Sequence, residues 1–317
     1  MTAEPAQLPH PGQKAFRDPI PYAGALVAMV LFAGNYIAGR HAAGLGFSPA
    51  DLVALRYGIA AVATLPLLLR HGSVAQLGGI GWRRGLALVV FAGAPYTAIG
   101  FAGLALAPAG HGAVLNPGAM MVAGVVLSAV FLGEPLRAPV LAGMAAVLAG
   151  LVLVAGGGIA HGDPAVRIGD LLLAGSGLQY AIFMILVRRW KIGALQGTAA
   201  INLLSALIWL PPYLATTGMS LFDRLPLVDI LLQAGLQGIV IGVLAGILYV
   251  HAVGSLGPAR AAFFPASLPV LGTVLAALLL GEPMTLLQAG GALAVCAGMI
   301  VALKPARRRE PAISRRA

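Results

Sequence analysis

Apolar stretches about as long as a membrane is thick recur along nearly the whole chain. A helix needs about 20 mostly apolar residues to cross the hydrocarbon core of a bilayer. Each stretch is long enough to do so, and only short polar breaks separate them. We therefore expect an all-α, polytopic membrane protein with ten transmembrane helices. The ten stretches are residues 21–39, 49–69, 85–105, 109–132, 136–156, 168–188, 195–217, 228–253, 258–280 and 285–303.

Composition excludes the main alternatives to a membrane protein. Hydrophobic residues make up 59% of the chain and charged residues only 9%. A soluble domain carries about a quarter charged residues, and a disordered chain combines low hydrophobicity with high net charge. The single cysteine, Cys296, excludes an internal disulfide and a multi-cysteine metal site. We expect no metal and no cofactor.

The net charge of +10 could suggest a nucleic-acid partner. However, membrane proteins collect Lys and Arg in their cytoplasmic loops. If the N-terminus is cytoplasmic, 16 of the 20 basic residues fall in inner segments and only three in outer ones. This distribution predicts that both termini are cytoplasmic, and it explains the charge without nucleic acid.

The chain repeats itself at an offset of 148 residues. Residues 133–135 and 281–283 are both Gly-Glu-Pro, and Pro117 aligns with Pro265. Since each copy contains five predicted helices, an odd number, the second copy must be inverted in the membrane. The predicted segments are a cytoplasmic N-terminal tail (1–19), a first repeat (20–158), a second repeat (166–304) and a basic cytoplasmic tail (305–317).

These features resemble the EamA-type exporters of the drug/metabolite transporter superfamily. The resemblance rests on the ten spans, the two halves, both Gly-Glu-Pro junctions, and an aromatic residue before Gly34-Asn35 and Arg40 in the first span. In layout the chain is similar to YddG-type exporters of aromatic and other neutral amino acids. The resemblance implies a transporter, and it covers exporters of amino acids, other metabolites and drugs.

The two aligned prolines are candidate hinges. A proline inside a helix removes a backbone hydrogen bond and bends the helix. The predicted topology places Pro117 in the outer half of the membrane and Pro265 in the inner half. Inverted-repeat transporters bind substrate near the midplane and open to each side in turn. One hinge on each side fits this alternating access.

Polar and aromatic side chains inside the spans are the candidate substrate-binding residues. A polar side chain in hydrocarbon needs a partner, so these residues should face the bundle interior. They can bind the ammonium, carboxylate and side chain of an amino acid, or they can simply join helices. The candidates are Asn35, Tyr36, Tyr96, Thr97, Asn116, Gln179, Tyr180, Gln237, Phe264 and Ser267.

All ten acidic residues lie in tails, in loops or near span ends. A carboxylate at the midplane would indicate a proton or ion relay, and its absence favours uniport or facilitated efflux. His111 and His251 are alternative proton carriers or interfacial residues. Arg56 is interpreted as structural, either reaching outward or pairing with Asp51.

The sequence thus predicts an exporter of small metabolites, chiefly neutral and aromatic amino acids, in a bacterial inner membrane. Export of other metabolites or drugs is the alternative within the superfamily. An intramembrane enzyme would need a nucleophile–base pair or metal cluster within the spans, and the sequence offers neither. A scaffold or channel would not need paired hinges. The expected partners are a small-molecule substrate and the lipid bilayer, and a monomer fits the prediction.

Overall fold

The computed structural model describes residues 19–70, 74–107, 109–154, 163–218, 220–280 and 284–304. These residues form helices and connecting turns, without strands. Six helices are long and apolar enough to cross a membrane, and two shorter apolar helices accompany them. This confirms the expected all-helical membrane protein. The count of ten spans stays a prediction, and the chain ends lie outside the described residues.

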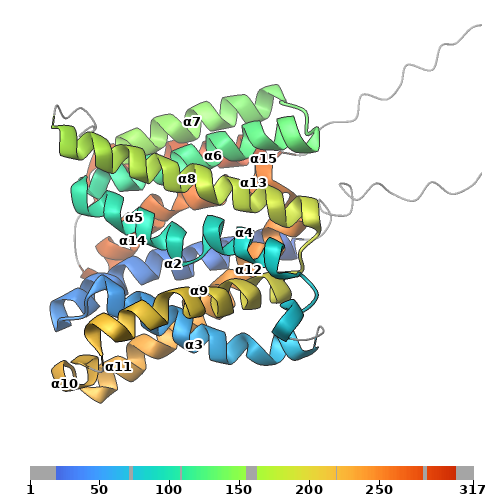
Figure 1. Ribbon diagram of the computed structural model, residues 1–317. Helices are drawn as coiled ribbons and strands as arrows, with labels where there is room; N and C mark the ends of the chain where they lie inside the picture. The colour runs from blue at the N-terminus through green and yellow to red at the C-terminus, as the bar shows by residue number, and fades with distance from the viewer. Residues whose placement is uncertain are drawn as a thin grey trace, which may run out of the picture.

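The first half of the chain contributes helices that lie roughly alongside one another (Figure 1). Two of them, α4 and α5, meet end to end at Gly93, so together they act as one broken helix. The helices are α2 (Ile20–Leu45), α3 (Pro49–Arg70), η1 (Val74–Gln76), α4 (Trp82–Ala92), α5 (Ala94–Leu106), α6 (Ala109–Leu132) and α7 (Ala138–Val154).

The second half repeats this order with different local irregularities. Its long central helix changes from α to π geometry and back, from α11 through η2 to α12. The elements are α8 (Pro164–Trp190), α9 (Ala194–Thr217), α10 (Ser220–Arg224), α11 (Leu227–Ala234), η2 (Gly235–Ala245), α12 (Gly246–Leu256), α13 (Pro258–Ala261), η3 (Phe264–Ser267), α14 (Leu268–Leu280) and α15 (Leu286–Leu303).

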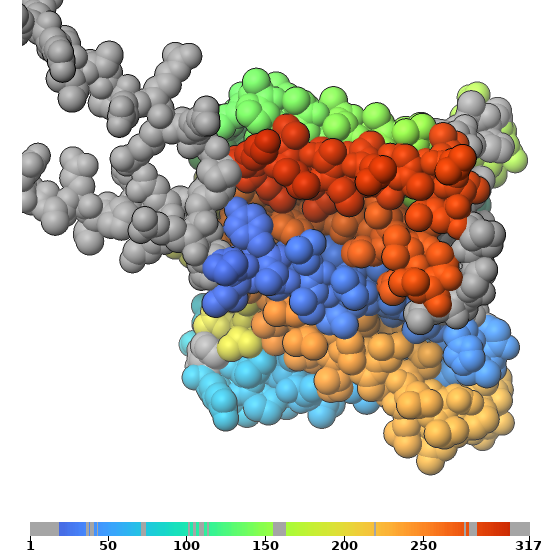
Figure 2. Space-filling model, turned by 180° about the vertical axis from the view of Figure 1, so that it is seen from behind, coloured from blue at the N-terminus to red at the C-terminus, as the bar shows by residue number. Residues whose placement is uncertain are grey.

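Helices from the two halves are interleaved. The last helices of the halves, α7 and α15, pack on each other, and so do α3 and α9. In the space-filling view, the red α15 lies against the green α7 (Figure 2). Helix α8 packs on α6 and on the α4–α5 pair, while α2 packs on α14 and on the η2–α12 segment. Equivalent helices therefore have equivalent neighbours, as two related repeats require.

Four glycines bring α7 and α15 into backbone contact. A Cβ atom added to Gly143 would lie 2.5 Å from the carbonyl oxygen of Gly298, and one added to Gly150 would lie 2.7 Å from that of Gly291. Because residue number rises along α7 while it falls along α15, the two helices are antiparallel. Gly143 and Gly150 align with Gly291 and Gly298 in the repeat. The two contacts are thus related by an approximate two-fold axis, which supports an inverted repeat.

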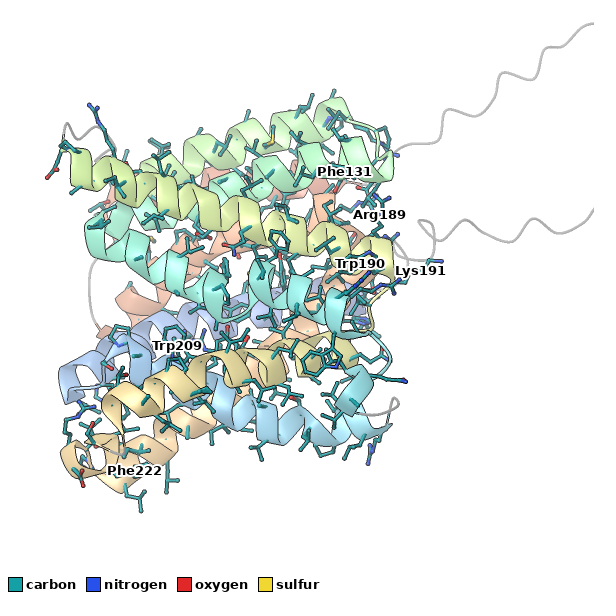
Figure 3. All side chains as sticks on the ribbon, in the orientation of Figure 1. Phe131, Arg189, Trp190, Lys191, Trp209 and Phe222 are labelled. Atoms are coloured by element: carbon teal, nitrogen blue, oxygen red, sulfur yellow. The ribbon has the colours of Figure 1, made fainter. Side chains whose placement is uncertain are left out.

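The outer surface is apolar, as contact with lipid requires. Val62, Leu171 and Leu278 are each more than 70% exposed, which in a soluble protein would leave large apolar patches facing water. Basic and aromatic side chains gather at one end of the bundle, where Arg189, Trp190 and Lys191 lie together (Figure 3). The Arg84 guanidinium lies 5.7 Å from the Trp190 ring centre. This is the end that the sequence predicts to be cytoplasmic.

Candidate functional site

Three polar side chains from α2, α3 and η2 form a hydrogen-bonded chain inside the bundle. Arg56 donates to the side-chain oxygen of Gln237 from both Nε (3.1 Å) and Nη2 (2.6 Å). The Gln237 amide nitrogen in turn donates to Asn35 Oδ1 over 2.7 Å. Gln237 is only 1% exposed. The chain therefore joins residues of both halves through a buried amide.

Gln237 lies in the π-helical segment, which the sequence did not predict. Single π turns are often found at functional sites because they shift side chains out of the α-helical register. A π-helix bonds each N–H five residues back, so carbonyl groups at its junctions lose their usual partners. The Asn202 side chain of α9 donates to the Gly242 carbonyl over 3.0 Å. Gly238 lies so close to α3 that an added Cβ would be 2.4 Å from Ile59 Cβ.

The equivalent helix of the first half breaks at Gly93. The freed backbone N–H of Ala94 donates to Ser205 Oγ of α9 over 3.1 Å, and Thr97 Oγ1 donates to the Gly93 carbonyl over 3.1 Å. The Thr97 hydroxyl also lies 3.0 Å from the Tyr57 hydroxyl. Helix α9 thus supports the irregular stretch of both halves, and Thr97 links that stretch to α3.

Aromatic rings from α5, α8 and α12 form a second group. Tyr180 is at its middle, with ring centroids 5.0 Å from Tyr96, 5.0 Å from Phe183 and 6.0 Å from Tyr249. The rings are tilted rather than stacked face to face, which is the favoured geometry for aromatic contacts. The Tyr249 hydroxyl donates to the Ala261 carbonyl over 3.0 Å. These rings again come from both halves.

The other predicted substrate-binding residues lie apart from these two groups. Asn116 donates to Ser176 Oγ over 2.6 Å, which joins α6 to α8. Phe264 is buried, with its ring centroid 6.4 Å from that of Tyr22, and Ser267 Oγ donates to the Phe264 carbonyl over 2.7 Å. The Tyr36 side chain lies outside the described part of the structure.

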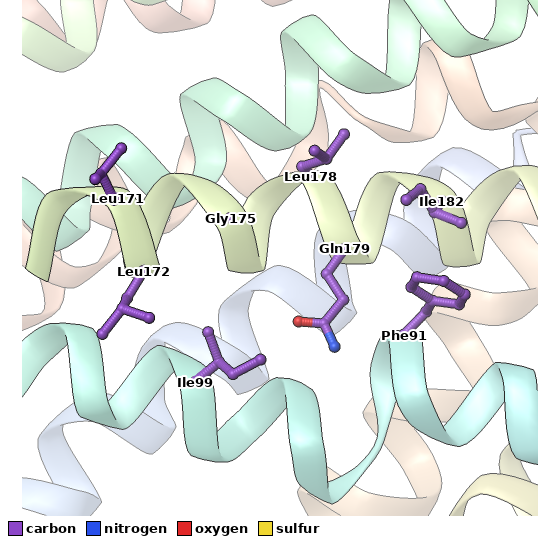
Figure 4. A pocket seen from close by; sticks show the side chains of 8 residues that line it. All are labelled: Phe91, Ile99, Leu171, Leu172, Gly175, Leu178, Gln179 and Ile182. Carbon is purple, nitrogen blue, oxygen red and sulfur yellow. The ribbon is translucent and has the colours of Figure 1, made fainter. Parts of the chain in front are cut away.

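Gln179 is in a shallow, mostly apolar groove on the outside of α8, facing α4 and α5 (Figure 4). Its amide nitrogen donates to the Val90 carbonyl, close to the helix break at Gly93. The groove is otherwise lined by apolar residues such as Phe91 and Ile99. Gln179 therefore stabilises the broken helix rather than joining the polar chain of Gln237.

The two predicted hinge residues have different surroundings. Pro117 lies inside α6, which continues on both sides of it. Pro265 lies in the 3-10 segment η3, where the helix changes from α13 to α14. Both prolines are buried. The helix interruption that a hinge would use is therefore pronounced only in the second half.

The sequence suggested that Arg56 is structural and that its side chain reaches outward or pairs with Asp51, and the structure shows a different position for this side chain. It bonds to Gln237 inside the bundle, while Asp51 accepts from Tyr213 Oη at 2.6 Å and lies 3.3 Å from Arg224 Nη2. The five-residue spacing between Arg56 and Asp51 explains why the two side chains have different partners. Residues on one helix face are three or four apart, and a spacing of five turns the two side chains about 140° away from each other.

Sequence reasoning also missed a pair formed by a buried histidine and a partly exposed acid. His111 Nδ1 lies 2.7 Å from Asp170 Oδ1, between α6 and α8. The His111 side chain is 2% exposed and that of Asp170 is 25% exposed. Among the described residues, no three His, Cys, Asp or Glu side chains gather as metal ligands do. The pair thus joins two helices close to their ends.

A charged cluster lies at the end of the bundle that carries Arg189. Arg188 donates to the Gly254 carbonyl, and an added Cβ at Gly257 would lie 2.9 Å from Glu134 Oε1. Burial raises the pKa of Glu134, against the opposing effect of Arg188, Arg260 and Arg137. The acidic residue of the first Gly-Glu-Pro sequence therefore packs against the turn between α12 and α13.

Comparison with known proteins agrees with this architecture. The chain is 32% identical over 285 residues to an uncharacterized protein of Pseudomonas aeruginosa, covering 88% of this chain and 93% of that one. A crystal structure of a protein matches the fold with a TM-score of 0.70 at 20% identity, covering 90% of this chain and 96% of the other. The profile of the EamA-like transporter family matches twice, at residues 20–156 and 167–304. The chain therefore has two repeats and belongs to the EamA-like transporter family of the drug/metabolite transporter superfamily, as a multi-pass membrane transporter.

Proposed function

We propose that the protein exports small metabolites, chiefly neutral and aromatic amino acids, by alternating access. The proposal rests on contacts across the two repeats, one between polar side chains and one between aromatic rings. Asn35 of the first repeat bonds to Gln237 of the second, and Tyr96 of the first packs against Tyr180 of the second. Substrate sites of inverted-repeat transporters lie where the repeats meet.

The chemistry of the two groups suits an amino acid. Amide and hydroxyl groups donate to a carboxylate and accept from an ammonium. Aromatic rings such as Tyr180 provide a surface for an apolar or aromatic side chain. If the repeats move relative to each other, contacts such as Asn35–Gln237 must break and form again, which makes them sensitive to the transport cycle.

Facilitated efflux down a concentration gradient is the proposed energetics. The buried Asp51 is bonded to Tyr213, and the partly buried Asp170 lies against His111. We place the protein in a bacterial inner membrane with both termini in the cytoplasm. The basic cluster around Arg189 at one end of the bundle supports this orientation.

Efflux from proteoliposomes tests the proposal. Vesicles containing the purified protein are loaded with radiolabelled L-phenylalanine, L-leucine or L-alanine, and loss of label is compared with protein-free vesicles. We expect protein-dependent efflux that falls at least tenfold in Gln237→Leu. Arg70→Gln, which changes an exposed residue at the end of α3, should transport like the wild type. Absence of efflux for all three amino acids, with efflux of an unrelated metabolite, would refute the substrate class.

A further inference from the structure

The helical hydrogen bonding of the backbone is interrupted once in α4–α5 and once in α11–η2–α12, and side chains of α9 bond to both interruptions. We propose that Ser205 and Asn202 of α9 are positioning residues of the transport cycle. They hold the interruptions in the described state and release them when the repeats move. The inference rests on alternating access, which is part of the proposed function, and not on the identity of the solute.

The first interruption lies between α4 and α5. In an α-helix the N–H of Ala94 would bond to the carbonyl of Val90, four residues earlier. Here the Ala94 N–H donates to Ser205 Oγ over 3.1 Å instead. The Val90 carbonyl accepts a hydrogen bond from the Gln179 side chain. Two side chains of the second repeat therefore replace one backbone hydrogen bond of the first repeat.

The second interruption lies at the end of η2. In an α-helix the N–H of Gly246 would bond to the Gly242 carbonyl, but here it bonds to the Val243 carbonyl. The Asn202 side chain donates to the Gly242 carbonyl over 3.0 Å. A side chain of α9 thus replaces the α-helical donor of this carbonyl.

The two interruptions are at equivalent positions of the repeats. The offset of 148 residues aligns Ala94 with Gly242. Asn202 and Ser205 are three residues apart, so they lie on the same face of α9. Their exposed fractions are 3% and 0%. One buried face of α9 therefore bonds to matching places in the two repeats.

Each interruption can close without leaving its backbone group unpaired. Inside a membrane an unpaired backbone N–H or carbonyl is costly, so a broken helix depends on neighbouring side chains for partners. If the Ala94 N–H returns to Val90, it still makes one hydrogen bond. The Gly242 carbonyl likewise keeps a donor if the Gly246 N–H returns to it. The interrupted form and this continuous form are therefore similar in hydrogen bonding, as a reversible movement requires.

A buried hydroxyl on α9 can accept the Asn202 amide once that amide leaves Gly242. Thr198 is 4% exposed, and its Oγ1 atom has no hydrogen-bond partner among the described residues. Thr198 precedes Asn202 by four residues, which places both side chains on one face of α9. A Cβ added at Gly246 would lie 3.7 Å from Thr198 Oγ1, so the hydroxyl is beside the second interruption. Thr198 thus provides a partner for Asn202 in the continuous form.

Distances across each interruption test the inference. Pairs of spin labels are attached to introduced cysteines in the full-length protein in lipid nanodiscs, after the exposed Cys296 is replaced by serine. The labelled positions are exposed residues on either side of an interruption, Leu86 with Leu106 and Leu231 with His251. The control pair is Ile168 with Arg189, on the continuous helix α8. Each pair spans about 30 Å of helix. We expect two distances across each interruption and one along α8.

Variants should shift these populations in opposite directions. Ser205→Ala removes the acceptor of the Ala94 N–H and should lower the interrupted population of the first pair at least threefold. Asn202→Leu should do the same at the second pair. Thr198→Val, which keeps the shape of the side chain, should raise the interrupted population of the second pair at least twofold. Thr216→Ala is the matched control, because it removes an exposed hydroxyl that bonds within α9.

Two results would overturn the inference alone. The first is a single distance at both interruptions, unshifted in every variant, from protein that still transports amino acids. The second is a shift of the same sign in Asn202→Leu and Thr198→Val, which would mark a general loosening of α9. Shifts of opposite sign without efflux of any amino acid would support the inference and refute only the proposed substrate class.

Discussion

Replacing Gly291 with alanine should force α15 away from α7. An added Cβ would lie 2.7 Å from the Gly150 carbonyl oxygen and 2.8 Å from the Val154 nitrogen. Ordinary contact begins near 3.4 Å, so the helices must separate locally by about 0.7 Å. Both clashing atoms are backbone and cannot rotate away. Overpacking of this kind costs about 1–3 kcal/mol.

The neighbouring Gly290 provides a matched control. An added Cβ there meets nothing within 4 Å. Both alanine variants gain about the same helix propensity, about 1 kcal/mol, so the difference between their unfolding free energies isolates the clash. We expect Gly291→Ala to be about 1–3 kcal/mol less stable than Gly290→Ala in reversible SDS unfolding from mixed micelles. Gly143→Ala, at the symmetry-related position, should lose a similar amount.

Equal unfolding free energies for the Gly291 and Gly290 variants would refute the reasoning. They would mean that α7 and α15 can separate at no cost, or that their contact is not as close as the structure has it. A large loss for Gly291→Ala with none for Gly143→Ala would leave the close contact in place. It would contradict the approximate two-fold relation between its two ends.

Three further predictions follow from the fold. Pro117→Ala and Pro265→Ala should slow efflux without lowering folded yield, and unchanged efflux in both variants would contradict their role as hinges. Because burial raises the pKa of Glu134 above the usual 4.5 of a glutamate, the folded protein binds this proton more tightly than the unfolded chain does. Stability therefore falls as pH rises through the raised pKa. Glu134→Gln should therefore be more stable than the wild type at pH 7, and the difference should vanish towards pH 4 in thermal melts. If efflux is uncoupled from protons, an imposed pH gradient should not drive accumulation of substrate. Accumulation that is lost in His111→Gln would instead make the His111–Asp170 pair a proton site.

The architecture could be predicted from the sequence because the hydropathy of each span depends only on neighbouring residues. The all-helical membrane fold and the two repeats are confirmed, since hydropathy and the 148-residue offset can be read without knowing which helices touch. The aligned glycines, such as Gly143 and Gly291, indicate more than the presence of a repeat. Their spacing also determines where α7 and α15 meet.

The site was harder to predict because partners in a helical bundle are set by packing rather than by spacing along the chain. Gln237 and Asn35 were both candidates, yet nothing in the sequence indicates that they bond to each other across 202 positions. The π-helix that carries Gln237 has no simple sequence signal. Asn116 looked equivalent to these residues, but it joins α6 to α8 through Ser176.

The contact between α7 and α15 also has a consequence for the origin of the chain. Each of its two ends uses one glycine from each repeat, at equivalent positions. A half-length ancestor inserted into the membrane in both orientations would already possess this interface as a homodimer. Fusion of the two copies would then fix their ratio and their opposite orientations. It would also free each copy to acquire its own irregular helix, a break at Gly93 in one and the π-helical turn around Gln237 in the other.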